Sequence, residues 1–98
     1  MTIIDVDRFA GGVLWEEKSA DGRDPRIATQ AWINKHVIRK FDSYVRARPH
    51  LEGHERAPVG LHMTAKDVEP GFKASVNSAV EKWRSENPGV EAQIRWAE

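Results

Sequence analysis

Cysteine is absent from this chain of 98 residues. The absence excludes a disulfide framework and a thiolate metal site, and it is the usual state of cytosolic proteins. No basic segment followed by a long apolar run opens the sequence, so we predict no signal peptide. No uncharged stretch approaches the roughly 20 apolar residues that a membrane helix requires. We therefore predict a cytoplasmic protein that makes no contact with membranes.

The sequence motifs of nucleotide-binding and hydrolytic enzymes are absent as well. The chain has no Gly-rich phosphate loop ending in Lys-Ser/Thr, no dinucleotide fingerprint and no Gly-x-Ser-x-Gly motif. No cofactor is predicted on these grounds. The missing motifs favour a function that does not involve catalysis.

What the chain does contain is typical of one folded domain. Hydrophobic residues make up 40% of it and charged residues 31%, with four tryptophans among the aromatic side chains. Such a composition is typical of a globular protein and not of a disordered chain. No repeat, low-complexity tract or long linker divides the sequence. We predict a single globular domain over residues 1–98.

Strand patterns occur at both ends of the chain and once near its middle. Residues 3–9 and 13–18 flank the glycine pair 11–12, which predicts a β-hairpin. Residues 59–64 alternate apolar and polar side chains and suggest a short strand, although Thr64 with Asp67 would equally suit the start of a helical turn. Residues 90–96 alternate in the same way and predict a final strand.

Two helices separate these strands in the prediction. The first is expected to begin at Asp24-Pro25, because the carboxylate can cap the first turn and proline has no amide to lose there, and to end before Pro49. Helical spacing predicts that its core side is formed by Ile27, Ala31, Ile38, Phe41 and Val45, flanked by Ile33, Val37 and Tyr44. The second helix starts near Phe72 and is expected to stop at Asn87-Pro88-Gly89.

The predicted order of elements is ββαβαβ. Strands that alternate with period two are half-buried, and such strands are typical of antiparallel sheets with one covered face. The sequence therefore predicts an α+β domain in which a small, mostly antiparallel sheet of about four strands carries two amphipathic helices on one face. The final strand is expected at a sheet edge, where it has little protection by Lys and Arg, so pairing of two copies as a homodimer is left open.

Charge is unevenly distributed although its sum is zero. Residues 25–50 contain six basic residues and one acid, whereas the acids outnumber the bases on either side of this segment. The candidate partner-binding residues lie on the outward side of the predicted helix 25–47 and in the adjoining exposed loop 48–58. The helix carries Lys35, Arg39 and Arg46, with Trp32 and His36 at the edge of that side, and the loop adds Arg48. Guanidinium and ammonium groups bind anionic groups, and an indole can anchor a partner. A plain solvated face is the competing interpretation, because Asp42 can pair with Arg39 or Arg46.

Candidate metal ligands lie in two other places, and we predict no metal site at either. His50 and His54 in the loop do not have the helical spacing that places two imidazoles on one face. Asp5 and Asp7 share one side of the first strand, with Glu16 and Glu17 across the hairpin, and such acidic pairs are common on exposed strands. An exposed polar loop and an exposed strand face explain the two groups better than a metal site does.

Three functional hypotheses follow, in this order. The first is a non-enzymatic regulator, inhibitor or adaptor that binds a macromolecular partner, a protein, through helix 25–47 and loop 48–58. The second is a nucleic-acid-binding protein that uses the same basic face, and the zero net charge counts against it. The third is a metal-dependent hydrolase built on the acidic hairpin or the two histidines.

Overall fold

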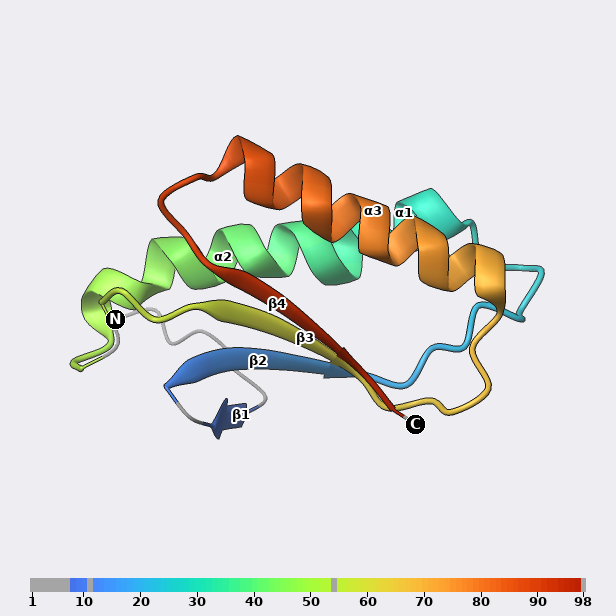
Figure 1. The fold of residues 1–98 in the computed structure, drawn as a ribbon, viewed down its shortest axis with the longest axis horizontal. Helices are drawn as coiled ribbons and strands as arrows, with labels where there is room; N and C mark the ends of the chain where they lie inside the picture. The colour runs from blue at the N-terminus through green and yellow to red at the C-terminus, as the bar shows by residue number, and fades with distance from the viewer. Residues whose placement is uncertain (1–7, 11, 54, 98) are drawn as a thin grey trace.

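The computed structural model describes residues 8–10, 12–53 and 55–97, which form an α+β domain (Figure 1). Its strands are β1 (Arg8–Ala10), β2 (Val13–Lys18), β3 (Val59–Met63) and β4 (Ala92–Trp96), arranged in the spatial order β1-β2-β3-β4. The predicted order ββαβαβ is confirmed for the described elements. Residues 59–63 are a strand and not the start of a helix.

The prediction of a mostly antiparallel sheet is wrong. Only the short β1 runs antiparallel to its neighbour, whereas β2, β3 and β4 are parallel to one another. A helix lies between each successive pair of parallel strands and returns the chain to the same end of the sheet, as parallel pairing requires. β3 and β4 nevertheless alternate in polarity because helices cover just one face of this sheet. The apolar–polar alternation therefore indicated a sheet that is covered on one face, and it gave no information on the direction of the strands.

The predicted hairpin is present where the structure describes it. Ala10 faces Val13 and Arg8 faces Trp15, and Gly12 lies in the turn between the two strands. Gly12 has a φ of +79°, a value that glycine adopts at little cost. The remainder of the predicted first strand, residues 3–7, lies outside the described residues.

The first helix is a single rod of three successive segments, α1 (Thr29–Ile33), a π-helical turn η1 (Asn34–Ile38) and α2 (Arg39–Ala47) (Figure 1). It begins five residues later than Asp24. The Asp24 carboxylate accepts hydrogen bonds from the backbone and side chain of Arg26, and its carbonyl accepts from the amide of Ile27. Asp24 and Pro25 therefore form a turn before the helix, which is the other structure that these two residue types favour.

The core side of this helix also differs from the prediction. Ile33, Val37, Phe41 and Tyr44 are completely buried, whereas Ile27 and Ala31 are exposed and Ile38 and Val45 are half-buried. The late start removes Ile27 from the helix. In the π turn, hydrogen bonds span five residues instead of four, so the chain winds less per residue. Side chains spaced by four residues, Ile33, Val37 and Phe41, thereby stay on one side.

The second helix, α3 (Pro70–Glu86), follows the prediction closely. Glu69 caps it, because its carboxylate accepts hydrogen bonds from the amides of Gly71 and Phe72 at 2.9 and 2.8 Å. These bonds hold the pKa of Glu69 below its ordinary value. The helix ends before Asn87-Pro88, where the Asn87 side chain donates to the carbonyl of Trp83.

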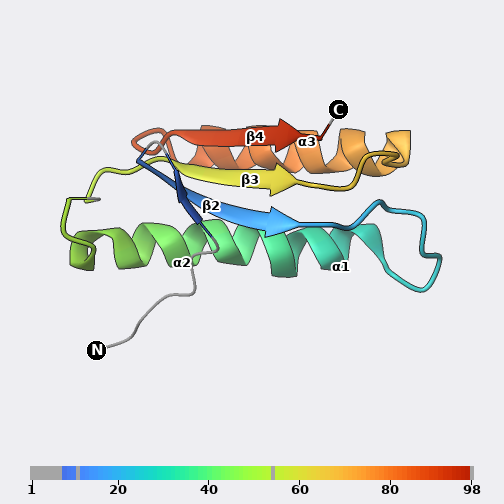
Figure 2. The same cartoon turned by 90° about the horizontal axis from the view of Figure 1, so that it is seen from below.

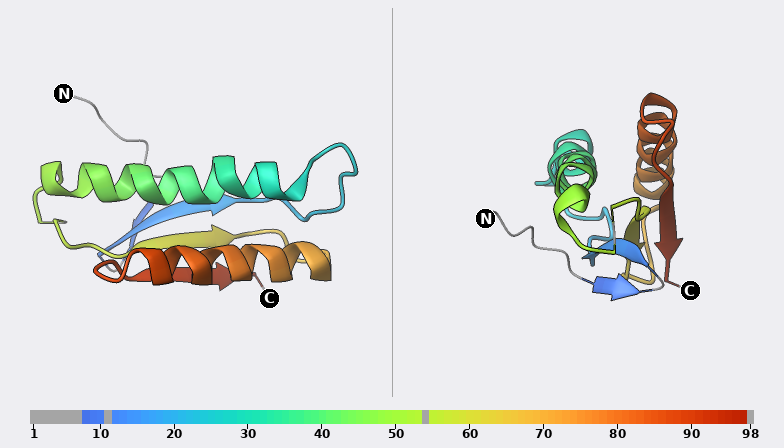
Figure 3. Two further views of the ribbon diagram at one scale, coloured as in Figure 1. Left: turned by 90° about the horizontal axis from the view of Figure 1, so that it is seen from above. Right: turned by 90° about the vertical axis from the view of Figure 1, so that its left-hand side faces the viewer.

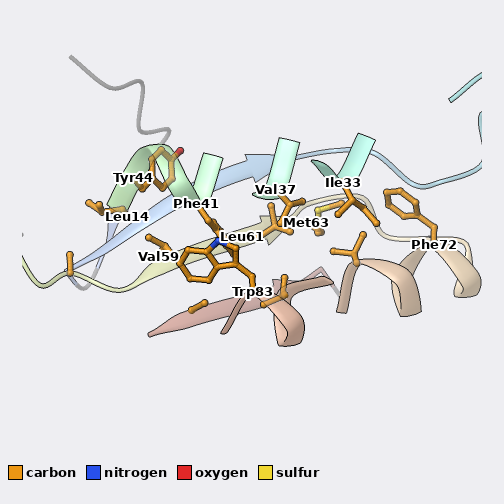
Figure 4. Packing of buried hydrophobic residues seen from close by; sticks show 14 residues of the cluster. Leu14, Ile33, Val37, Phe41, Tyr44, Val59, Leu61, Met63, Phe72 and Trp83 are labelled. Atoms are coloured by element: carbon orange, nitrogen blue, oxygen red, sulfur yellow. The ribbon is translucent and has the colours of Figure 1, made fainter. Parts of the chain in front are cut away.

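Both helices cover the same face of the sheet, as predicted, and no described helix lies over the other face (Figures 2 and 3). The core fills the space between the layers (Figure 4). Phe41 of the first helix meets the Trp83 ring of α3 edge to face, with ring centroids 5.2 Å apart. On the sheet side, the core is completed by the buried strand residues Leu14, Val59, Leu61 and Met63.

The β4 strand lies at the edge of the sheet, with no described strand beyond it. The edge position is the geometric requirement for the homodimer described above, and self-pairing stays a prediction. Among the residues that the structure describes, no helix is long and apolar enough to cross a bilayer.

Candidate functional site

The outward side of the first helix presents three basic residues, which we call the cationic helix surface: Lys35, Arg39 and Arg46. All three are exposed. Lys35 and Arg39 make no hydrogen bond or ion pair with any described residue, and Arg46 reaches only the hydroxyl of Ser43, at 3.4 Å. The structure therefore leaves their charges available to a partner.

Asp42, on the same helix, is bound by a side chain of α3. Its Oδ1 accepts a hydrogen bond of 2.9 Å from the indole Nε1 of Trp83, which ties α2 to α3. Among the described residues Asp42 forms no ion pair with Arg39 or Arg46, so the pairing that the solvated-face interpretation allowed is not present. Indole N–H groups that become buried need an acceptor, and the nearest carboxylate serves that purpose here.

Trp32 is half-buried, contrary to the predicted exposed position. Its ring packs edge to face on Phe72 with centroids 5.2 Å apart, and it lies 5.1 Å from the ring of His36. The π turn explains the difference, because the chain rotates less between Trp32 and the buried Val37 than in an α-helix, which brings Trp32 closer to the core side. Trp32 therefore supports the fold more than it offers an apolar anchor.

His36 lies in a positive environment. Partial burial lowers the pKa of its imidazole below the ordinary value of 6.5, and the charges of Lys18, Lys35 and Lys40 lower it further. The neutral imidazole is consequently the favoured form near pH 7. Lys18 and Lys40 come from the sheet and the helix, so the positive region extends from the cationic helix surface towards β2.

Acidification is expected to destabilise the protein through His36. Because its folded pKa lies below 6.5, the unfolded chain takes up the proton first, and stability falls as the pH decreases from 6.5 to the folded pKa. Urea unfolding at pH 7.5, 6.5 and 5.5 measures this loss, and His36→Gln should remove that part of it. An equally steep loss in His36→Gln would assign the effect to other groups.

Arg48 holds the loop 48–58 instead of projecting from it. Its guanidinium donates to the carbonyl of Ala57 at 3.0 Å, while Ala57 is buried and Leu51 packs against the core. A 3₁₀ turn, η2 (Arg48–His50), continues directly from α2. The prediction of an exposed loop is therefore only partly right, and Arg48 has a structural contact.

The metal candidates gain no support. His50 is exposed at the end of η2, whereas Asp5, Asp7 and His54 lie outside the described residues. Within residues 8–10, 12–53 and 55–97, no group of three or more His, Asp or Glu side chains is placed to hold a metal ion.

Glu16 is buried, with only 2% of its surface exposed. It lies on the helix-covered face of β2, where its carboxylate accepts a 2.8 Å hydrogen bond from the hydroxyl of Tyr44. Lys18 and Lys40 approach it to 3.4 and 3.9 Å. The hairpin acids therefore separate, because adjacent residues of a strand point to opposite faces: Glu16 enters the core and Glu17 lies on the opposite face.

Glu17 belongs to a row of polar side chains that the sequence did not indicate. In the sheet register Glu17 of β2 faces His62 of β3, and His62 faces Arg95 of β4. An acid, an imidazole and a guanidinium are thus neighbours on the face opposite the helices. The three positions are 45 and 33 residues apart in sequence, so no local motif could have revealed them.

A groove of about 540 Å³ separates α1 and η1 from α3 on the solvent side of the helices. Its walls mix small and polar side chains, including Gln30, Asn34, Ser75, Ser78 and Lys82. They contain no histidine and no pair of acids. The groove therefore offers shape without an evident reactive group.

Neither a family model, nor a curated protein, nor a solved structure matches the chain. Function is therefore argued from the geometry alone.

Proposed function

We propose that this protein is a non-enzymatic binding domain, a regulator, inhibitor or adaptor, that recognises an acidic surface on a protein partner through the cationic helix surface. The observation that carries this proposal is the absence of ion pairs: Lys35 and Arg39 are exposed and pair with no described residue, while the Asp42 carboxylate is hydrogen-bonded to Trp83. Exposed cations held on a rigid helix are well suited to electrostatic recognition.

The rigidity of the surface supports this role. The helix is fixed to the sheet by four completely buried side chains and to α3 by the Asp42–Trp83 hydrogen bond. Side chains on such a rod are displayed at fixed spacing, so binding orders little backbone. A protein partner is favoured over nucleic acid because the whole chain has no net positive charge to attract a polyanion.

Nucleic acid binding is the second candidate, and the position of Trp32 favours it. A half-buried Trp32 contributes little apolar contact, which leaves cations as the main groups available on this face. Contacts made by cations alone suit phosphates. The two candidates differ in their response to salt, which weakens phosphate binding steeply.

Replacing Lys35, Arg39 and Arg46 together by Ala is expected to weaken partner binding about tenfold or more. Each exposed charge pair contributes up to about 1 kcal/mol, and about 1.4 kcal/mol corresponds to tenfold. Tagged protein is used to capture partners from a lysate of the source cells, with and without nuclease, and the captured species is then purified. Its affinity for wild type and variant is measured by interferometry at 50 and 200 mM salt.

A matched control removes the same charge elsewhere. Lys66, Lys82 and Arg84 are exposed and lie outside the first helix, so their replacement by Ala tests the effect of net charge alone. Retained binding in this control with loss in the first variant supports the proposal. Nuclease-sensitive capture with a steep salt dependence supports the nucleic-acid candidate, and unchanged affinity of the Lys35/Arg39/Arg46 variant contradicts both.

A further inference from the structure

The sheet face opposite the helices carries chemistry that the proposed function does not use. Figure 2 shows this face, with β2, β3 and β4 side by side. Glu17, His62 and Arg95 occupy one row across the three strands, in direct register. Neighbouring strands lie about 4.8 Å apart. Two side chains of the row that come from neighbouring strands can therefore contact the same small ligand.

Glu17 orients the imidazole of His62. Its Oε2 lies 2.9 Å from Nδ1 of His62, and both side chains are partly buried, with 32% and 20% of their surfaces exposed. The carboxylate thereby directs the second nitrogen, Nε2, away from Glu17. When the imidazole is neutral and donates its Nδ1–H to Glu17, Nε2 is a hydrogen-bond acceptor, and when it is protonated Nε2 is a donor.

Arg95 is positioned by an aromatic support. Its guanidinium carbon lies 5.3 Å from the centre of the Trp15 ring, a cation–π contact that crosses the middle strand. Gly60 allows this approach, because a Cβ at that position would lie 2.6 Å from two carbons of the Trp15 ring. The missing side chain of Gly60 thus lets the indole lie over β3 beneath the guanidinium.

Two members of the row, His62 and Arg95, have hydrogen-bonding groups that bind no described residue. Within the described part of the chain, neither Nε2 of His62 nor any N–H of the exposed Arg95 makes a hydrogen bond. Glu17 is bound to the imidazole of His62 and lies two strands away from Arg95. Its carboxylate therefore forms no ion pair with the Arg95 guanidinium.

We propose that His62 and Arg95 form a binding site for a phosphate group. A guanidinium donates two parallel N–H groups to two oxygens of an anion. An ionised carboxylate has no proton to donate to a neutral Nε2, whereas a monoanionic phosphate carries a hydroxyl on a third oxygen that can donate. Nε2 accepts from the hydroxyl of a monoanionic phosphate or, when protonated, donates to a dianionic one, so Glu17 and His62 together accommodate both forms.

The probe that tests this site is inorganic phosphate, titrated into ¹⁵N-labelled protein at constant ionic strength and followed by NMR. We expect saturable shifts of the His62 imidazole and Trp15 indole signals, because the guanidinium above the indole moves to the ligand. Chloride at the same ionic strength should not produce them. Absence of a saturable shift up to about 50 mM phosphate, which is an affinity weaker than about 2 kcal/mol, overturns the proposal.

Variants separate the site from general anion attraction. Arg95→Gln is expected to weaken phosphate binding about tenfold or more, since it removes charge-assisted hydrogen bonds. His62→Gln should weaken it less, and Arg95→Lys should retain part of it, because the charge stays while the planar fork is lost. The control Arg84→Gln removes an exposed cation from α3 and should leave phosphate binding unchanged.

Folding of each variant is checked by its backbone NMR spectrum, and Arg95→Lys serves if Arg95→Gln is disturbed. Phosphate shifts that persist in Arg95→Gln, or that weaken equally in Arg84→Gln, contradict the assignment. This site lies on the face opposite the first helix, so its failure leaves the proposed partner binding unaffected.

Discussion

Replacement of Gly22 by Ala is expected to lower the free energy of unfolding by about 3 kcal/mol. Gly22 has a φ of +78°, and an added Cβ would lie 2.3 Å from both Cβ and Cγ of Phe72. A left-handed conformation costs a residue with a side chain about 1–2 kcal/mol, and overpacking adds about 1–3 kcal/mol. Phe72 is buried at the start of α3 and cannot withdraw without losing contacts in the core.

Substitutions at two other glycines separate the cost of the left-handed backbone conformation from the cost of overpacking. Gly53 has a φ of +82° but open space around its Cβ position, so Gly53→Ala should cost only the conformational part. Gly89 has neither a positive φ nor a neighbour within 4 Å, and Gly89→Ala should change stability by less than about 0.5 kcal/mol. Urea unfolding of the three variants gives the comparison. If Gly22→Ala cost no more than Gly53→Ala, the loop would not pack on Phe72 as described.

Tyr44→Phe is expected to destabilise the protein by about 2 kcal/mol. The change removes only a hydroxyl, but that hydroxyl donates a 2.8 Å hydrogen bond to the buried carboxylate of Glu16. Hydrogen bonds to charged groups contribute about 1.5–3 kcal/mol, and a buried carboxylate that loses a donor cannot recover it from water. Lys18 and Lys40 stay beside Glu16 at 3.4 and 3.9 Å and limit the loss.

A double-mutant cycle assigns this loss to the pair. If the hydroxyl acts through Glu16, Tyr44→Phe should cost at least about 1 kcal/mol less in a Glu16→Leu background than in the wild type. Ser85→Ala removes an exposed hydroxyl that donates to the Lys82 carbonyl, and we expect a change below about 0.5 kcal/mol. Equal costs of Tyr44→Phe in both backgrounds would show that the hydroxyl stabilises the fold in another way.

The elements that sequence predicted best are those with local signals at both ends. α3 combines a proline at its first position, apolar residues at helical spacing and a stop at Asn87-Pro88, and its bounds are close to those expected. The first helix lacked such a start. Asp24-Pro25 suits a cap and a turn equally well, and no single-residue preference announces the π turn that follows.

The two candidate sites differ in how well they could be predicted from the sequence. Lys35, Arg39 and Arg46 were found because they share one helix, where spacing alone places them on one side. The engagement of Asp42 by Trp83 was not foreseeable, since the two residues are 41 positions apart. Glu17, His62 and Arg95 were missed for the same reason: each is an ordinary polar residue within its own strand.

Sequence by itself determined the α+β class, the order of the elements, the two helices on one face and the concentration of positive charge in residues 25–50. These properties follow from local preferences and from the periodicity of apolar side chains, which act over a few residues. Tertiary structure decided the parallel pairing, the burial of Glu16 and the row on the open sheet face. Those depend on which distant segments pack together, because a crossover of the chain sets the strand direction and register, and only then do residues far apart in sequence become neighbours.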